Sequence, residues 1–156
     1  MPTSWRIVKK AHSSTAFDGE GARRYPGQWN NRGVPMIYTA ESRSLATLEA
    51  LVNYEGVERR QLPDCVIFEV SFPDSAVEAV TPDSLPAGWD GPLPHPTTRT
   101  IGDRWTQTRR SAVLRVPSAV TEGEWNYLLN PQHPEFEPIA ISAPRPFCWD
   151  RRLGGS

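Results

Sequence analysis

Proline is the residue that most limits how this chain can fold. Sixteen of the 156 residues are proline, about twice the average usage. Proline fixes the backbone angle φ and lacks an N–H group, so it interrupts helices and sheet interiors. The prolines stand between short apolar runs, which predicts a loop-rich globular fold with short elements. The length fits one domain, which we assign to residues 1–153, with residues 154–156 as an expression scar or flexible tail.

The apolar runs predict more strands than helices. Strands are expected at residues 5–8, 34–40, 66–72, 112–116 and 138–142. One helix is expected from Ser42, whose hydroxyl can cap its first turn, to Gly56. A second helix is expected at residues 104–110, and a helical or turn segment at residues 125–129. No strand–helix–strand repeat is visible, so we predict the α+β class, a single domain in which helices pack on a mixed or antiparallel sheet.

Charge and hydropathy limit the classes of partner. The formal net charge is −1, which gives no general electrostatic reason to bind nucleic acid or an anionic membrane. No apolar stretch approaches the ~20 residues that span a bilayer, and the N-terminus lacks the apolar region of a signal peptide. We therefore expect a cytoplasmic protein that contacts neither nucleic acid nor membrane.

The thiols and imidazoles give no metal-ligand pattern. The two cysteines are Cys65 and Cys148, and His12, His95 and His133 are scattered along the chain. None of them has thiol or acidic neighbours at zinc-site spacing. We predict no metal site and no disulfide framework.

Gly19-Glu20-Gly21 has the first two glycines of a dinucleotide-binding loop. The full fingerprint needs a third glycine and lies between a strand and a helix. Arg24 occupies the third position here, and the loop leads towards an expected strand. This reading is therefore rejected.

The same loop carries three arginines and a tryptophan. Arg23, Arg24 and Arg32 lie within ten residues; they form either a solvated surface or a phosphate clamp, because guanidinium groups match phosphate oxygens. Trp29 either covers the core or forms an aromatic wall for a flat ligand.

Three further residues are candidates for catalysis. Tyr38 lies in an apolar strand, where a structural tyrosine is the simpler explanation. Glu49 borders the apolar stripe of the first expected helix, and a carboxylate there is either in a salt bridge or functional. Ser118 follows Val116-Pro117 and is either a turn residue or part of the site.

Taken together, these stretches resemble one family, the RES-domain proteins. The matching stretches are WRI, GEGARRYPGQWNNRGVPMIYTAES, LATLEALV, TRTIGDRW, VLRVPSAV and NYLLNPQHP. They occur in the family's order and span nearly the whole chain, so the match is specific.

The resemblance implies a function. RES proteins are cytoplasmic toxins of bacterial toxin–antitoxin pairs, their fold is similar to that of ADP-ribosyltransferases, and they act on NAD. The resemblance implies NAD as substrate, with no permanently bound cofactor, and an Xre-type helix-turn-helix antitoxin as partner. It also implies assembly into a homo-oligomer, or into a hetero-oligomer with that antitoxin.

Residue by residue, the resemblance places Tyr38, Glu49 and Ser118 at the family's catalytic positions. Arg6, in WRI, matches a characteristic arginine of the first strand. We assign NAD binding to a second group, which consists of Arg6, Arg24, Gln28, Trp29 and Arg32.

The chain departs from the family pattern at Gln28. Where the family reads G-R-W-N, this sequence reads Gly27-Gln28-Trp29-Asn30. Glutamine brings no charge to a phosphate, so the departure predicts a lower activity.

Three functions stay open from the sequence. The first is cleavage of the nicotinamide–ribose bond by water or phosphate, the second is transfer of ADP-ribose to a protein, and the third is a weakened toxin that acts mainly with its antitoxin in operon repression.

Overall fold

Eight strands form one sheet in the computed structural model, which describes residues 1–54 and 57–153. They are β1 (Thr3–Lys9), β2 (Ile37–Ala40), β3 (Cys65–Ser71), β4 (Val77–Ala79), β5 (Val113–Pro117), β6 (Trp125–Leu129), β7 (Ala140–Ile141) and β8 (Arg145–Phe147). The order is β4-β5-β6-β2-β1-β3-β7, and β8 also pairs with β3. The β4–β5 pair is parallel, whereas the strands of the central run from β5 to β3 pair antiparallel. The predicted α+β class with a mixed sheet is confirmed.

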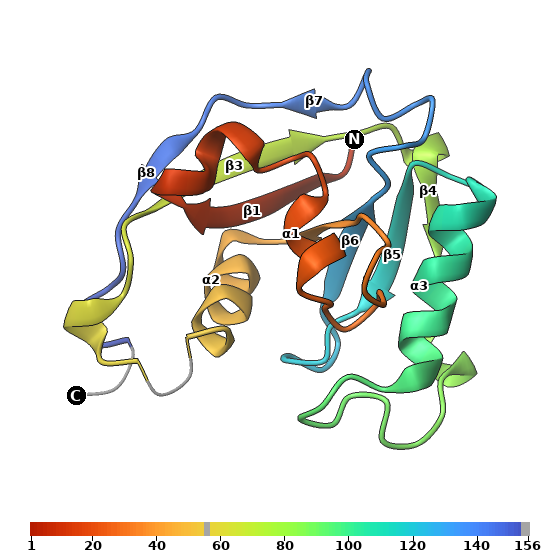
Figure 1. The fold of residues 1–156 in the computed structure, drawn as a ribbon, viewed down its shortest axis with the longest axis horizontal. Coiled ribbons are helices and arrows are strands. Elements are labelled where there is room, and N and C mark those ends of the chain that lie inside the picture. Colours follow the sequence, from red (N-terminus) through yellow and green to blue (C-terminus); the bar gives the residue numbers. More distant parts are fainter. Residues whose placement is uncertain (55–56, 154–156) are drawn as a thin grey trace.

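Three α-helices and four short 3-10 helices join the strands of the described chain. The α-helices are α1 (Glu20–Arg24), α2 (Arg43–Val52) and α3 (Pro96–Thr108). The 3-10 helices are η1 (Lys10–Thr15), η2 (Arg59–Gln61), η3 (Asp74–Ala76) and η4 (Pro82–Ser84). Figure 1 shows β1 and β3 running across the direction of β5 and β6. Helix α2 lies below β1, and α3 lies on the side of β5 that faces away from α2. No described helix is long and apolar enough to cross a membrane.

Apolar side chains pack on both faces of the central strands. Leu129 of β6 lies in one cluster with Ile37 and Val113, whereas its neighbour Leu128 lies in a second cluster with Leu114. Successive residues of a strand point to opposite faces, so these strands are buried on both sides. Such strands read as continuous apolar runs, which periodicity alone does not separate from helix.

This double burial explains the main error of the sequence prediction. Residues 125–129 were expected to form a helical or turn segment, but they form β6, between β2 and β5. The expected strand at residues 138–142 is reduced to the two residues of β7, and β8 was missed. The expected loop at residues 13–33 contains α1 and part of η1.

Both predicted helices are present, as α2 and α3, but their ends differ from the predicted ones. Ser42 caps α2 as predicted, because its hydroxyl oxygen accepts a hydrogen bond from the Leu45 amide. The helix ends at Val52, and the expected end at Gly56 lies outside the described residues, as do residues 154–156. The helix expected at residues 104–110 begins earlier, because Pro96 occupies a first-turn position that needs no N–H donor.

Candidate functional site

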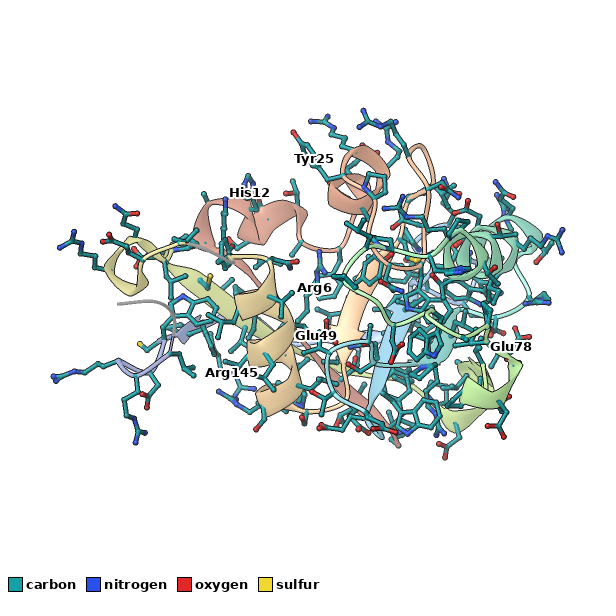
Figure 2. All side chains as sticks on the ribbon, turned by 90° about the horizontal axis from the view of Figure 1, so that it is seen from below. Arg6, His12, Tyr25, Glu49, Glu78 and Arg145 are labelled. Carbon is teal, nitrogen blue, oxygen red and sulfur yellow. The ribbon has the colours of Figure 1, made fainter. Side chains whose placement is uncertain are left out.

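A cavity of about 860 Å³ lies beside α2. Its lining comes from β1, the α1–β2 region, α2, the segment before α3, the β5–β6 loop and β6. The charged residues of the lining are Arg6, Glu49 and Asp90. Figure 2 shows Arg6 and Glu49 close together beside α2 in the middle of the view, and Tyr25 at the edge of the molecule. The volume is in the range of small-molecule sites.

Glu49 is the half-buried carboxylate of this cavity, whereas Asp90 is exposed. The hydroxyl of Ser118 donates a hydrogen bond of 2.9 Å to Oε1 of Glu49. Burial raises the pKa of Glu49, and hydrogen bonds from the side chains of Ser118 and Asn126 oppose that rise. Glu49 belongs to none of the ion pairs found among the described residues. The salt-bridge explanation is therefore wrong for this glutamate.

Ser118 is a turn residue that also contacts Glu49. Its hydroxyl oxygen accepts hydrogen bonds from the amides of Val120 and Thr121, at 3.0 and 3.1 Å. These two bonds orient the hydroxyl, so that its proton points to Glu49. Ser118 is buried, and the turn thus fixes one hydrogen bond of the carboxylate.

Tyr38 lines the cavity, and its hydroxyl is fully engaged with the preceding loop. It donates to Oδ1 of Asn30 at 2.6 Å and accepts from the Trp29 amide at 3.0 Å. Burial raises the pKa of Tyr38, so the phenol stays protonated. Gly27 must lack a side chain, because an added Cβ would lie 2.8 Å from the Tyr38 ring.

Arg6 is the one cation among the lining residues. Its Nε donates to the carbonyl of Ala16 and its Nη1 to the carbonyl of Tyr38, both at 2.8 Å. Burial lowers the pKa of Arg6 to about 10, with an opposing effect from Asp18. Arg6 is therefore charged at neutral pH and joins β1 to β2 beside the cavity.

Gln28 and Trp29 both belong to the cavity lining, but their side chains are engaged with other parts of the protein. The side chain of Gln28 donates to the carbonyl of Trp89 at 2.8 Å. Trp29 is 2% exposed and packs in the core with Met36 and Trp105. Trp29 is thus a core residue, although it also belongs to the cavity lining.

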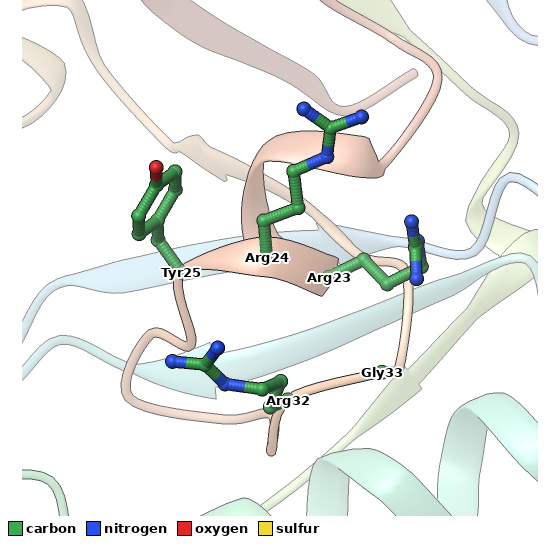
Figure 3. Close-up of a pocket in the computed structure, with 5 residues that line it drawn as sticks. All are labelled: Arg23, Arg24, Tyr25, Arg32 and Gly33. Atoms are coloured by element: carbon green, nitrogen blue, oxygen red, sulfur yellow. The ribbon is translucent and has the colours of Figure 1, made fainter.

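Arg24 and Arg32 lie outside this cavity. They line a shallower pocket of about 350 Å³ together with Arg23, Tyr25 and Gly33. Figure 3 shows that the three guanidinium groups point in different directions. Tyr25 lines both hollows, so the arginine cluster is next to the cavity. It does not form a clamp inside it.

Two asparagines of the site were not predicted. Asn30 is buried, and its amide nitrogen donates to the carbonyls of Ala22 and Val34. The side chain of Asn126 opposes the rise of the Glu49 pKa, and its amide nitrogen donates to the Thr39 carbonyl at 3.3 Å. Both lie in the matched stretches GQWN and NYLLNP, which is the signal that was available.

The described residues contain no group of three or more His, Cys, Asp or Glu side chains placed to hold a metal ion. The two described cysteines, Cys65 and Cys148, are free thiols.

Comparisons with known proteins identify relatives along the whole length. The family model of the RES domain matches residues 3–150. The "Prs ADP-ribosylating toxin" of Sphingobium sp. (strain YBL2) is 37% identical over 98% of this chain and 98% of its own. The protein "Toxin Res" of Photorhabdus laumondii is 36% identical over 96% of this chain and 95% of its own.

A solved structure has the same fold. It is the crystal structure of the M. tuberculosis MbcT–MbcA toxin–antitoxin complex, with a TM-score of 0.76 and 19% sequence identity. The match covers 93% of this chain and 83% of that chain.

Proposed function

This chain belongs to the RES domain family, and we propose that it is the toxin of a bacterial toxin–antitoxin pair that degrades NAD by cleaving the nicotinamide–ribose bond. The names of the relatives, "Toxin Res" and "Prs ADP-ribosylating toxin", support the toxin class. The observation that carries the proposal is a half-buried carboxylate, Glu49, on the wall of a large cavity and without an ion-pair partner in the described chain.

Cleavage of this bond needs a fixed negative charge. The nicotinamide leaves as a neutral molecule, and positive charge builds up on the ribose, as in glycoside cleavage. A preorganised carboxylate beside that charge stabilises the transition state more than the ground state. Glu49 serves this purpose in its ionised form, and its hydrogen bond from Ser118 holds one oxygen in place.

The other residues of the cavity position NAD. We assign the pyrophosphate to Arg6, because it is the cation of the lining, and the nicotinamide side to the ring of Tyr38. Arg24 and Arg32 are assigned to the outer end of NAD, at the neighbouring hollow that Tyr25 shares with the cavity. NAD is the substrate and no bound cofactor is needed.

The proposal is tested by incubating the purified protein with NAD that is labelled in its adenosine part. We expect loss of NAD and release of nicotinamide. Label in free ADP-ribose indicates hydrolysis, label in a phosphorylated ADP-ribose that forms only in phosphate buffer indicates phosphorolysis, and protein-bound label indicates transfer. Unchanged NAD in this assay, and also in bacteria after induced expression, would contradict the proposal.

Transfer of ADP-ribose to a protein is a second candidate. The observation that favours it is the name of the 37% identical relative, an ADP-ribosylating toxin. Both reactions use the same carboxylate, so only the acceptor separates them.

A weakened toxin that acts mainly through its antitoxin is a third candidate, and Gln28 favours it. Gln28 replaces the arginine of the family pattern, and a charge-assisted hydrogen bond exceeds a neutral one by about 1–2 kcal/mol. If the missing charge limits activity, we expect Gln28→Arg to raise NAD turnover about ten-fold. Equal turnover of the two proteins, at limiting and at saturating NAD, would reject the weakened-toxin candidate.

The acid limb of the pH–rate profile is expected to report Glu49. Activity falls as pH drops through its raised pKa, because the protonated acid carries no charge. In Ser118→Ala the carboxylate loses a hydrogen bond that lowers this pKa, so the limb of kcat/KM is expected to move to higher pH. Ser75→Ala, an exposed serine of η3, is the control. A purely structural role of Ser118 would lower the rate without moving the limb.

The mouth of the cavity offers a surface for an antitoxin. Among the described residues, the exposed large apolar side chains other than Met1 are Tyr25, Leu48, Val52, Leu93 and Val120. Tyr25, Val52 and Val120 line the cavity. The other two are next to lining residues in the sequence: Leu48 precedes Glu49, and Leu93 lies between Pro92 and Pro94. Exposed apolar groups gathered at one place indicate an interaction surface.

We therefore expect a cognate Xre-type antitoxin to form a hetero-oligomer with this chain and to cover that mouth. Hydrogen exchange with and without antitoxin is expected to show added protection at residues 25–33 and 48–54. Protection confined to β7 and β8, away from the mouth, would mean that inhibition works by another route.

A further inference from the structure

The segment at residues 86–95 forms part of the cavity wall without belonging to a helix or strand. Asp90, Gly91, Pro92 and Pro94 line the cavity. Within the segment, the Trp89 amide donates to the Pro86 carbonyl and the Gly91 amide to the Gly88 carbonyl, both at 3.2 Å. Figure 1 shows this segment leading into the start of α3. A wall of this kind needs contacts from elsewhere to keep its position.

Gln28 supplies such a contact from the α1–β2 loop. Its Nε2 donates to the Trp89 carbonyl at 2.8 Å and lies 3.4 Å from Oγ1 of Thr98. The rings of Trp29 and Trp89 also meet, with centroids 6.2 Å apart. Both links join residues that are about sixty positions apart in the sequence.

The backbone of Gln28 is itself fixed to the first turn of α3. The hydroxyl of Thr98 donates to the Gln28 carbonyl at 2.7 Å. The guanidinium of Arg99 donates from Nε to the Gly27 carbonyl at 3.0 Å. Helix α3 thus holds residues 27–28 in place, and the Gln28 side chain reaches from there to the segment before α3.

We propose that Gln28 is a positioning residue that holds the segment 86–95 as one wall of the cavity and thereby sets the affinity for NAD. Its amide suits this task, because it donates to a carbonyl without placing a charge in the wall. In this role Gln28 acts through Trp89 and does not contact the reacting atoms. The consequence for NAD rests on the proposed function, whereas the contact with the segment does not.

The test compares Gln28→Met, which keeps the length of the side chain and removes its donor, with the exposed Gln107→Met on α3. In Gln28→Met we expect faster amide exchange in residues 88–91 and a KM for NAD about five-fold higher, the size that loss of one neutral hydrogen bond implies. The kcat is expected to stay within about two-fold, and Gln107→Met to match the original protein.

Unchanged exchange of the segment in folded Gln28→Met would overturn the proposal, as would a fall in kcat with an unchanged KM. If Gln28→Met does not fold, the isosteric Gln28→Glu is measured in the same way, because its carboxylate oxygen cannot donate to the Trp89 carbonyl. If the original protein leaves NAD intact, the proposed function fails, and the exchange rates still decide whether Gln28 holds the segment.

Discussion

Glu49→Gln is expected to lower NAD turnover by at least about 10²–10³-fold, the range found when one preorganised electrostatic contact to a transition state is removed. Glutamine has the shape of glutamate and can accept the same hydrogen bond from the Ser118 hydroxyl. It lacks the negative charge that the ribose cation needs. Turnover should therefore collapse in a protein that is still folded.

The folding stability of Glu49→Gln follows from the pKa of the glutamate. Burial raises that pKa in the folded protein, so the native state binds the proton more tightly than the unfolded chain. The stability contributed by Glu49 is then lost as pH rises from the unfolded pKa through the folded pKa. Glutamine does not titrate, so at neutral pH the variant should be at least as stable as the original protein.

The measurements are NAD consumption, circular dichroism and the free energy of unfolding at neutral pH. Glu137→Gln, at an exposed position outside the cavity lining, is the matched control and should keep full turnover. A folded Glu49→Gln protein with undiminished turnover would remove the carboxylate from the mechanism.

The sequence predicted those parts of the site that depend on local structure. The cap at Ser42 predicts the start of α2. The helical spacing of the apolar residues after it predicts the side of the helix on which Glu49 lies. The burial of this helix was predicted less well. Leu45 is buried, but Leu48 and Val52 are exposed beside the cavity. Periodicity finds an apolar stripe, but it does not tell whether a core or a partner covers it.

The remaining parts depend on contacts between distant residues. Ser118 meets Glu49 from 69 positions away, and Gln28 meets Trp89 from 61. Secondary-structure propensities and hydrophobic periodicity do not predict such contacts, because the order of the β-strands and the paths of the loops determine them. For the same reason the arginines of the 21–33 loop were grouped with the cavity, whereas Arg24 and Arg32 line a separate hollow. The resemblance to a family grouped Tyr38, Glu49 and Ser118; in the structure Ser118 is hydrogen-bonded to Glu49, and Tyr38 and Glu49 line the same cavity.

Gly102→Ala is expected to destabilise the protein by about 3 kcal/mol or more, beyond the usual range for a small addition to a packed core. Gly102 is buried on α3, where the backbone of Trp29 crosses the helix. An added Cβ would overlap the carbonyl oxygen and carbon of Trp29, and a backbone group cannot rotate away as a flexible side chain does. The gain in helix propensity from alanine, about 1 kcal/mol, does not offset this overlap.

The expected damage extends from Gly102 to the cavity. The Trp29 amide donates to the Tyr38 hydroxyl, so moving the Trp29 backbone away from α3 displaces the group that orients Tyr38. Gly21→Ala is the control for stability, because nothing lies within 4 Å of a Cβ added to this helical glycine. Denaturant unfolding of both variants gives the comparison, with NAD turnover measured on whatever Gly102→Ala protein stays folded. If Gly102→Ala unfolds at the same denaturant concentration as Gly21→Ala, then α3 and the Trp29 backbone do not approach each other this closely, and the loop that orients Tyr38 is held by other contacts.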